Sequence, residues 1–196
     1  MPKTLITDIK YLRLIKKRQL QQQIPPLALL ALSFLVSFAV PLFAFHYPSL
    51  VLSFIAIIWY LYVGICYRFR ERIVIPDGDL LLSPITGRVR FLKTSSDISL
   101  LKISKSPLDL IEIRSPHASS TWEEDTLRVS YQQHNLIFRF DAGHLIRFED
   151  APMDAGNTIG FIVGSGTVSI SLPNLLHTDL KVKDICQAGL SAIIAD

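Results

Sequence analysis

Two long apolar runs without a charged residue, Leu27–Phe45 and Leu50–Cys66, constrain the fold of this chain more than any other feature. A helix that crosses a bilayer needs about 20 apolar residues, with a range of roughly 17–25. The segment His46–Ser49 between the runs is short enough for a turn. The two runs therefore predict a transmembrane helical hairpin, in which we expect Pro41 to kink the first helix, as membrane helices tolerate.

Basic residues flank this predicted hairpin on both sides. Of the 20 Lys and Arg residues, nine lie within 3–18 and 68–72, where Asp8 and Glu71 are the only acidic residues. Residues 73–196 are acidic overall, so the net charge of +3 hides a strong asymmetry. An acidic domain with basic flanks argues for a phospholipid membrane as partner and against nucleic acid.

The basic flanks also predict the orientation of the hairpin. Cytoplasmic segments next to membrane helices carry an excess of Lys and Arg, so we expect both termini in the cytoplasm and the protein in the inner cell membrane. Arg68, Arg70 and Arg72 should then lie at the level of the headgroups. Residues 1–23 are basic with interspersed apolar side chains, which predicts either an amphipathic helix on the membrane surface or a disordered tail.

Residues 73–196 consist of short alternating runs separated by turn residues, and no stretch keeps a helical period for three turns. Many short strands at close spacing are typical of a sandwich or barrel. We therefore predict a membrane anchor at 1–72 and a cytoplasmic all-β domain of barrel or sandwich-hybrid type at 73–196. The expected strands are Leu80–Leu82, Arg88–Lys93, Leu100–Ser104, Leu108–Ile113, Thr126–Tyr131, Leu136–Phe140, His144–Phe148, Ile159–Val163, Thr167–Leu172 and Ala192–Ala195.

The His and Cys residues predict neither a metal site nor a disulfide. The five His residues show no metal-ligand spacing, so we predict no metal site. Cys66 follows an apolar run and Cys186 lies near the C-terminus, and we expect no disulfide between them. The polar, acidic segment His117–Asp125 is expected to form an exposed loop.

The segment Val163-Gly164-Ser165-Gly166-Thr167 lies between two runs with strand character. A Gly-Ser-Gly turn lets the backbone adopt strained conformations and places a hydroxyl beside the Gly164 carbonyl. One interpretation is a plain turn between strands, because Gly and Ser are common in turns. The other is a self-cleaving serine, in which the Ser165 hydroxyl attacks the Gly164 carbonyl. Elimination of the resulting ester would leave a pyruvoyl group, an electron sink that forms a Schiff base with an amine substrate.

Four segments resemble the short bacterial phosphatidylserine decarboxylases in order and spacing. Residues 75–89 (IPDGDLLLSPITGRV) are similar to the family's Ser-Pro-Ala-Asp-Gly-Lys/Arg-Val pattern, and residues 103–114 (ISKSPLDLIEIR) to its Ser-Pro-Phe-Asp-Val-His-Val-Asn-Arg segment. Residues 159–173 resemble its cleavage strand, and residues 181–194 its closing segment. Together with the hairpin, the resemblance covers residues 27–196.

This resemblance implies a self-processing, pyruvoyl-dependent enzyme that decarboxylates phosphatidylserine to phosphatidylethanolamine. Ser165 would be the precursor of the pyruvoyl cofactor, and Gly164 would become a new C-terminus. Two positions depart from the family. Thr86 stands where the family has the Asp that activates the serine, and Ile111 where it has a His. Neither side chain can act as a general base, whose loss typically costs about 10²–10⁴-fold in rate.

Four titratable residues could replace the missing base: Asp109, Glu112, His117 and His144. Of these we favour Asp109 and His144 as candidate catalytic residues. For each there is also a structural interpretation, namely Asp109 in a turn and His144 at a strand edge. The functional alternatives are a degenerate family member that acts as a membrane binding or scaffold protein, and a lipoyl-type or sugar-phosphotransfer barrel, for which His144 is the only candidate group. The sequence is also compatible with a homo-oligomer.

Overall fold

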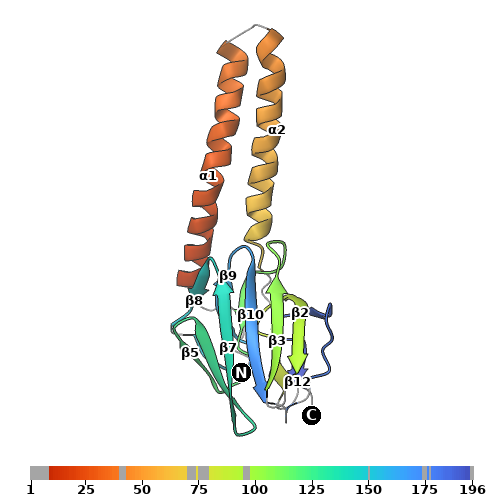
Figure 1. Cartoon of the computed structure of the whole chain (residues 1–196). Helices are drawn as coiled ribbons and strands as arrows, with labels where there is room; N and C mark the ends of the chain where they lie inside the picture. Colours follow the sequence, from red (N-terminus) through yellow and green to blue (C-terminus); the bar gives the residue numbers. More distant parts are fainter. Residues whose placement is uncertain are drawn as a thin grey trace. The chain divides into compact units, whose positions relative to one another are not determined.

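The computed structural model describes residues 9–39, 43–69, 74, 80–94, 98–149, 151–173, 176 and 178–194. The chain divides into two compact units, a helical one at Asp8–Tyr67 and a β-rich one that contains Arg68–Asp196 (Figure 1).

The helical unit consists of α1 (Ile9–Ala39) and α2 (Phe43–Cys66). Both helices are long and apolar enough to cross a membrane. Large apolar side chains are exposed along α2, among them Leu50, Phe54 and Leu61. A stripe of exposed apolar side chains is unusual for a protein surrounded by water, and it is the surface that lipid tails would cover.

Two hydroxyls join the helices where they pack. The Ser33 and Ser53 Oγ atoms lie 2.7 Å apart, so that one donates to the other, and each also lies within hydrogen-bond distance of a carbonyl of its own helix. Small residues such as Ser33 and Ala56 are buried at this contact. Small side chains let membrane helices approach closely, and a hydroxyl pair between them replaces water that lipid cannot supply.

The helix boundaries correct two expectations. α1 is continuous from Ile9 through Pro25 and Pro26. The described part of the segment 1–23, for which a separate surface helix is one of the two expectations, therefore belongs to this longer helix. His46–Ser49 forms the first turns of α2 and not a loop. Tertiary packing against a second helix stabilises these segments beyond what their propensity predicts. Pro41, the predicted kink, lies outside the described residues.

The β-rich unit contains twelve described strands: β1 (Leu81–Leu82), β2 (Gly87–Thr94), β3 (Ile98–Lys105), β4 (Glu112–Arg114), β5 (Ser120–Glu123), β6 (Thr126–Tyr131), β7 (His134–Ala142), β8 (Leu145–Arg147), β9 (Thr158–Ile162), β10 (Gly166–Pro173), β11 (Ile185–Cys186) and β12 (Ala192–Ile194). Among the described residues they form a seven-stranded sheet in the order β11-β2-β3-β10-β7-β6-β5, a three-stranded sheet β4-β9-β8 and the pair β1-β12.

The predicted β domain is therefore present, but the described strands do not close into a barrel. The seven-stranded sheet ends in β11 on one side and β5 on the other, so the barrel part of the prediction is not confirmed. All strand pairs described in this sheet are antiparallel.

Strand β10 is the central strand of the large sheet, with β3 on one side and β7 on the other (Figure 1). Its alternate residues Val168, Ile170 and Leu172 are fully buried. Val168 lies opposite both Ile103 of β3 and Phe140 of β7. Burial of each such side chain stabilises the fold by about 1.5–3 kcal/mol, so the strand that follows Ser165 is anchored in the core.

Two expected elements differ from the structure. The segment predicted as the loop His117–Asp125 contains β5, which pairs with β6. The predicted strand Leu108–Ile113 begins as a turn and becomes a strand only at Glu112. In β5, Ser120 and Trp122 face inward while Thr121 and Glu123 are exposed. The strand is held by pairing with β6 and by Trp122, which packs against the core.

Candidate active site

Gly164 and Ser165 lie in the connection between two sheets. β9 belongs to the three-stranded sheet and ends at Ile162, and β10 enters the seven-stranded sheet at Gly166. Gly164 has φ +82°, a conformation that glycine adopts without the steric cost of a side chain. The chain takes this backbone conformation where it passes from one sheet to the other, and glycine is therefore suited to the position.

The Gly164 carbonyl oxygen accepts a hydrogen bond from a buried lysine. Lys105 is the last residue of β3, and its Nζ lies 2.8 Å from the Gly164 oxygen. The same ammonium donates to the carbonyl oxygens of Ser106 at 3.1 Å and Asp109 at 3.3 Å. Lys105 is only 3% exposed, so these bonds form away from bulk water, where electrostatic attraction is stronger.

The register of the sheet places Lys105 at this position. Its Cα partner on β10 is Gly166, two residues after Gly164. Side chains alternate along β3, so that Leu101, Ile103 and Lys105 all face inward. A charged residue at an inward-facing position of a strand is unusual, and this is the signal by which the sequence could have identified Lys105.

The Ser165 side chain is exposed. Within the described part of the chain, no residue forms a hydrogen bond with its hydroxyl. The site therefore combines an exposed hydroxyl with a neighbouring carbonyl whose oxygen accepts a hydrogen bond from Lys105. No contact among these residues identifies a base that could take the hydroxyl proton.

The two favoured bases, Asp109 and His144, are connected to the turn at 163–165 by their backbone carbonyls and not by their side chains. The Asp109 carbonyl contacts the same ammonium as Gly164, while its carboxylate Oδ2 accepts the Ser106 N–H at 2.7 Å. The His144 carbonyl accepts the Val163 N–H at 3.1 Å, and its side chain is exposed. The structural interpretation of Asp109 as a turn residue is thus correct, and a catalytic role for either residue stays a prediction.

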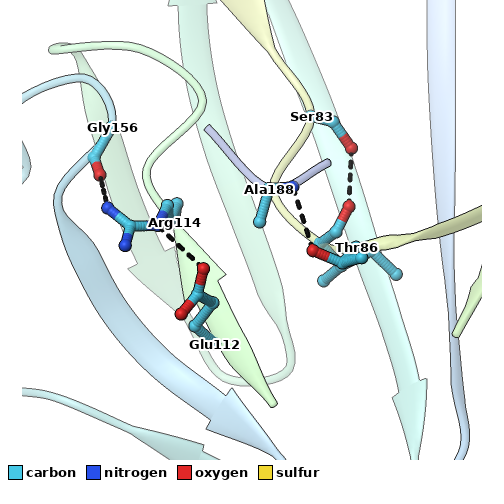
Figure 2. Close-up of polar contacts among 7 residues, drawn as sticks. Ser83, Thr86, Glu112, Arg114, Gly156 and Ala188 are labelled. Atoms are coloured by element: carbon cyan, nitrogen blue, oxygen red, sulfur yellow. Dashed lines mark hydrogen bonds and ion pairs between the residues drawn. The ribbon is translucent and has the colours of Figure 1, made fainter. Parts of the chain in front are cut away.

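The two positions that depart from the family have structural partners. The Thr86 hydroxyl accepts the Ala188 N–H at 3.2 Å (Figure 2). Ile111 is fully buried, and its backbone bonds to Arg68 and Ile162. Both residues therefore hold the fold together without supplying a base.

The remaining candidate residues take structural roles as well. Glu112 and Arg114 form a buried ion pair, Nε to Oε1 at 3.3 Å, and Arg114 also donates to the Gly156 carbonyl at 2.8 Å (Figure 2). His117 Nδ1 lies 2.7 Å from the Ser119 hydroxyl. Burial raises the pKa of the Cys186 thiol to about 11, and a thiol that stays protonated at neutral pH is a poor nucleophile.

A cleft of about 550 Å³ lies beside the site. Its wall includes Arg68, Phe69, Thr86, Asp109, Leu110, Ile185 and Gln187. Asp109 connects it to the site, because the Asp109 and Gly164 carbonyls share the Lys105 ammonium. The Arg68 guanidinium donates to the Leu108 carbonyl at 3.0 Å. The described lining of the cleft therefore offers one cation, one carboxylate and apolar surface.

No family model, curated protein or solved structure matches the chain. The resemblance to phosphatidylserine decarboxylases thus depends on the four sequence segments alone and stays a prediction.

Proposed function

We propose that this chain is a membrane-anchored, pyruvoyl-dependent decarboxylase that converts phosphatidylserine, or a related aminophospholipid, to phosphatidylethanolamine after cleaving itself between Gly164 and Ser165. The observation that carries the proposal is the exposed Ser165 hydroxyl directly after a carbonyl that a buried ammonium holds. A plain turn between strands requires neither feature.

Self-cleavage follows from ordinary serine chemistry. Ser165 Oγ attacks the Gly164 carbonyl carbon and gives its proton to a base, the C–N bond breaks, and the nitrogen takes up a proton, so that an ester replaces the peptide bond. Removal of the Ser165 Cα proton expels the Gly164 carboxylate and leaves an enamine. After tautomerisation, one water converts it to the pyruvoyl carbonyl and one ammonia is released.

The base for this sequence is proposed to be His144 or Asp109. His144 is the stronger of the two because its side chain is exposed, whereas the Asp109 carboxylate is engaged by the Ser106 N–H. Neither holds the Ser165 hydroxyl, so processing is expected to be slow.

The mature site would bind the substrate through its headgroup. The pyruvoyl group would supply an electrophilic carbonyl that binds the amine and accepts the electron pair left when CO₂ departs, after which a proton takes the place of the carboxylate. In the cleft, Arg68 would attract the phosphate of the headgroup. The apolar residues Phe69, Leu110 and Ile185 would contact the glycerol and the first part of the acyl chains.

The membrane anchor would bring this site to its substrate. The proposed location is the inner cell membrane, with the β-rich unit on the cytoplasmic side. Arg68, together with Arg70 and Arg72, which lie outside the described residues, would each contribute about 1 kcal/mol of attraction to anionic lipid.

The topology can be tested with reporters. Reporters fused at the N-terminus and after residue 196 should both read as cytoplasmic, because both flanks of the hairpin are basic. A reporter inserted within residues 40–42, between α1 and α2, should read as periplasmic. Accessibility of the C-terminal reporter from outside intact cells would contradict this orientation.

Decarboxylation is tested in membranes that contain phosphatidylserine labelled at the carboxyl carbon. The full chain should release labelled CO₂, and hydroxylamine or borohydride should abolish the release because both react with the pyruvoyl carbonyl. The Ser165→Ala variant provides the background. Full activity in the presence of either reagent would exclude a pyruvoyl mechanism.

A non-catalytic membrane scaffold is the second candidate function. Thr86 and Ile111 stand where the family has its Asp and His, and both make structural hydrogen bonds without supplying a base. This observation favours a scaffold. This alternative requires an uncleaved chain that binds anionic vesicles in a salt-sensitive manner without releasing CO₂.

A further inference from the structure

The lysine at the end of β3 has no role in our sequence predictions or in the family resemblance. Lys105 continues the inward-facing row of Leu101 and Ile103, so its charge lies where an apolar side chain would normally be. Among the described residues, the carbonyl oxygens of Ser106, Asp109 and Gly164 accept hydrogen bonds from its Nζ. The bond to Gly164 is the shortest of the three, at 2.8 Å.

We propose that Lys105 is a catalytic residue for self-cleavage, where its ammonium stabilises the negative charge that forms on the Gly164 oxygen. This inference rests on the proposed function. It names a group that would assist the attack of Ser165 in a chain that has Thr86 and Ile111 where the family has its Asp and His. When Ser165 Oγ attacks, the carbonyl oxygen changes from a neutral acceptor to an oxyanion. A cation that is already 2.8 Å from that oxygen and shielded from water gains attraction at this moment without having to move.

In this step Lys105 acts only as a hydrogen-bond donor, because its Nζ already donates to the carbonyl oxygens of Ser106, Asp109 and Gly164. The Ser165 proton goes to another group or to water. As the tetrahedral intermediate collapses, the C–N bond breaks, the C=O bond re-forms, and the nitrogen takes a proton. Lys105 remains hydrogen-bonded to the oxygen of the new ester.

A different role for Lys105 is to tie the turn at 106–109 to the turn at 163–165 without helping the reaction. A series of substitutions separates the two roles. Lys105→Met keeps the length and apolar stem but removes the charge. It also leaves the carbonyl oxygens that accept its hydrogen bonds without this donor, which lowers stability because a buried acceptor without a partner is costly. Lys105→Arg keeps the charge. Lys102→Met is the matched control, because Lys102 lies on the same strand, faces outward and contacts the ring of Phe91.

The experiment follows the intact mass of freshly synthesised full chain, in detergent, over time. Wild type and Lys102→Met should be cut at the same rate. Lys105→Met should be cut about 10²–10³-fold more slowly, the range for loss of one oxyanion donor, with Lys105→Arg in between. Hydroxylamine, which attacks esters, should speed release of the 165–196 fragment in wild type but not in Lys105→Met, because the ester forms slowly there. Thermal melting by circular dichroism reports whether each variant is folded.

The outcomes separate this inference from the proposed function. A folded Lys105→Met that is cut at the wild-type rate overturns the role of Lys105 and leaves the proposed function standing. A wild-type chain that stays whole overturns both. If Lys105→Met does not fold, Lys105→Gln, which keeps a donor without the charge, is compared in the same way, and a wild-type rate for that variant overturns the inference.

Discussion

Replacing Ser165 by alanine should leave the chain whole at 22.1 kDa, whereas the wild-type chain should separate into residues 1–164 and 165–196. The physical reason is that alanine has no nucleophile to attack the Gly164 carbonyl, so the ester cannot form. This is a change from processed to unprocessed chain, which intact-mass spectrometry detects directly. The fragment 165–196 should also resist Edman degradation, since its first residue would carry a ketone in place of an amine.

A matched control shows that the effect belongs to this hydroxyl. Ser171→Ala removes an exposed hydroxyl from β10, the strand that follows Ser165, and it should be processed as wild type is. The candidate bases are tested on the same readout. A chain that is cut in both Asp109→Ala and His144→Ala but not in Ser165→Ala would keep the self-cleavage and remove both proposed bases. A wild-type chain that stays whole, indistinguishable from Ser165→Ala, would favour the scaffold alternative.

Replacing Arg114 by methionine should lower the free energy of unfolding by about 3–5 kcal/mol, the range for removal of one partner from a buried ion pair. Arg114 and Glu112 are each about 1% exposed, so Glu112 would lose its cation in a site that water does not reach. Arg114 also donates to the Gly156 carbonyl at 2.8 Å, and a Cβ at Gly189 would lie 2.7 Å from its Cδ. The surrounding backbone is thus built closely around this side chain.

Thermal or denaturant unfolding of the full chain in detergent, followed by circular dichroism, measures the loss. The control is Arg128→Met, because Arg128 and Glu123 form a pair of 2.7 Å whose side chains are 59% and 48% exposed. An exposed pair contributes about 0–1 kcal/mol. The double variant Arg114→Met with Glu112→Leu should recover part of the loss, since neither charge of this pair then remains buried. Equal losses for Arg114→Met and Arg128→Met would contradict the argument from burial.

The helices and the strand at the candidate site could be predicted because their signals are local. Leu50–Cys66 carries no charge over a membrane-spanning length, and α2 ends at Cys66 as that run does. The alternation of Val168, Ile170 and Leu172 predicts the buried face of β10 without reference to any partner.

Elements stabilised by partners could not be predicted in this way. Strand β5 is polar, and its strand conformation depends on pairing with β6. His46–Ser49 contains turn residues and nevertheless continues α2, because a helix packed against another gains stability that local propensity does not include.

By itself, the sequence determined that this protein has two apolar helices, a mostly β unit and a Gly164-Ser165 bond at the entrance of a buried strand. Only the tertiary structure decided which cation meets that bond. Lys105 and Gly164 are 59 residues apart in the chain, and they meet because antiparallel pairing of β3 with β10 sets Lys105 opposite Gly166. Such a contact depends on strand order and register, which are set by the packing of the whole core.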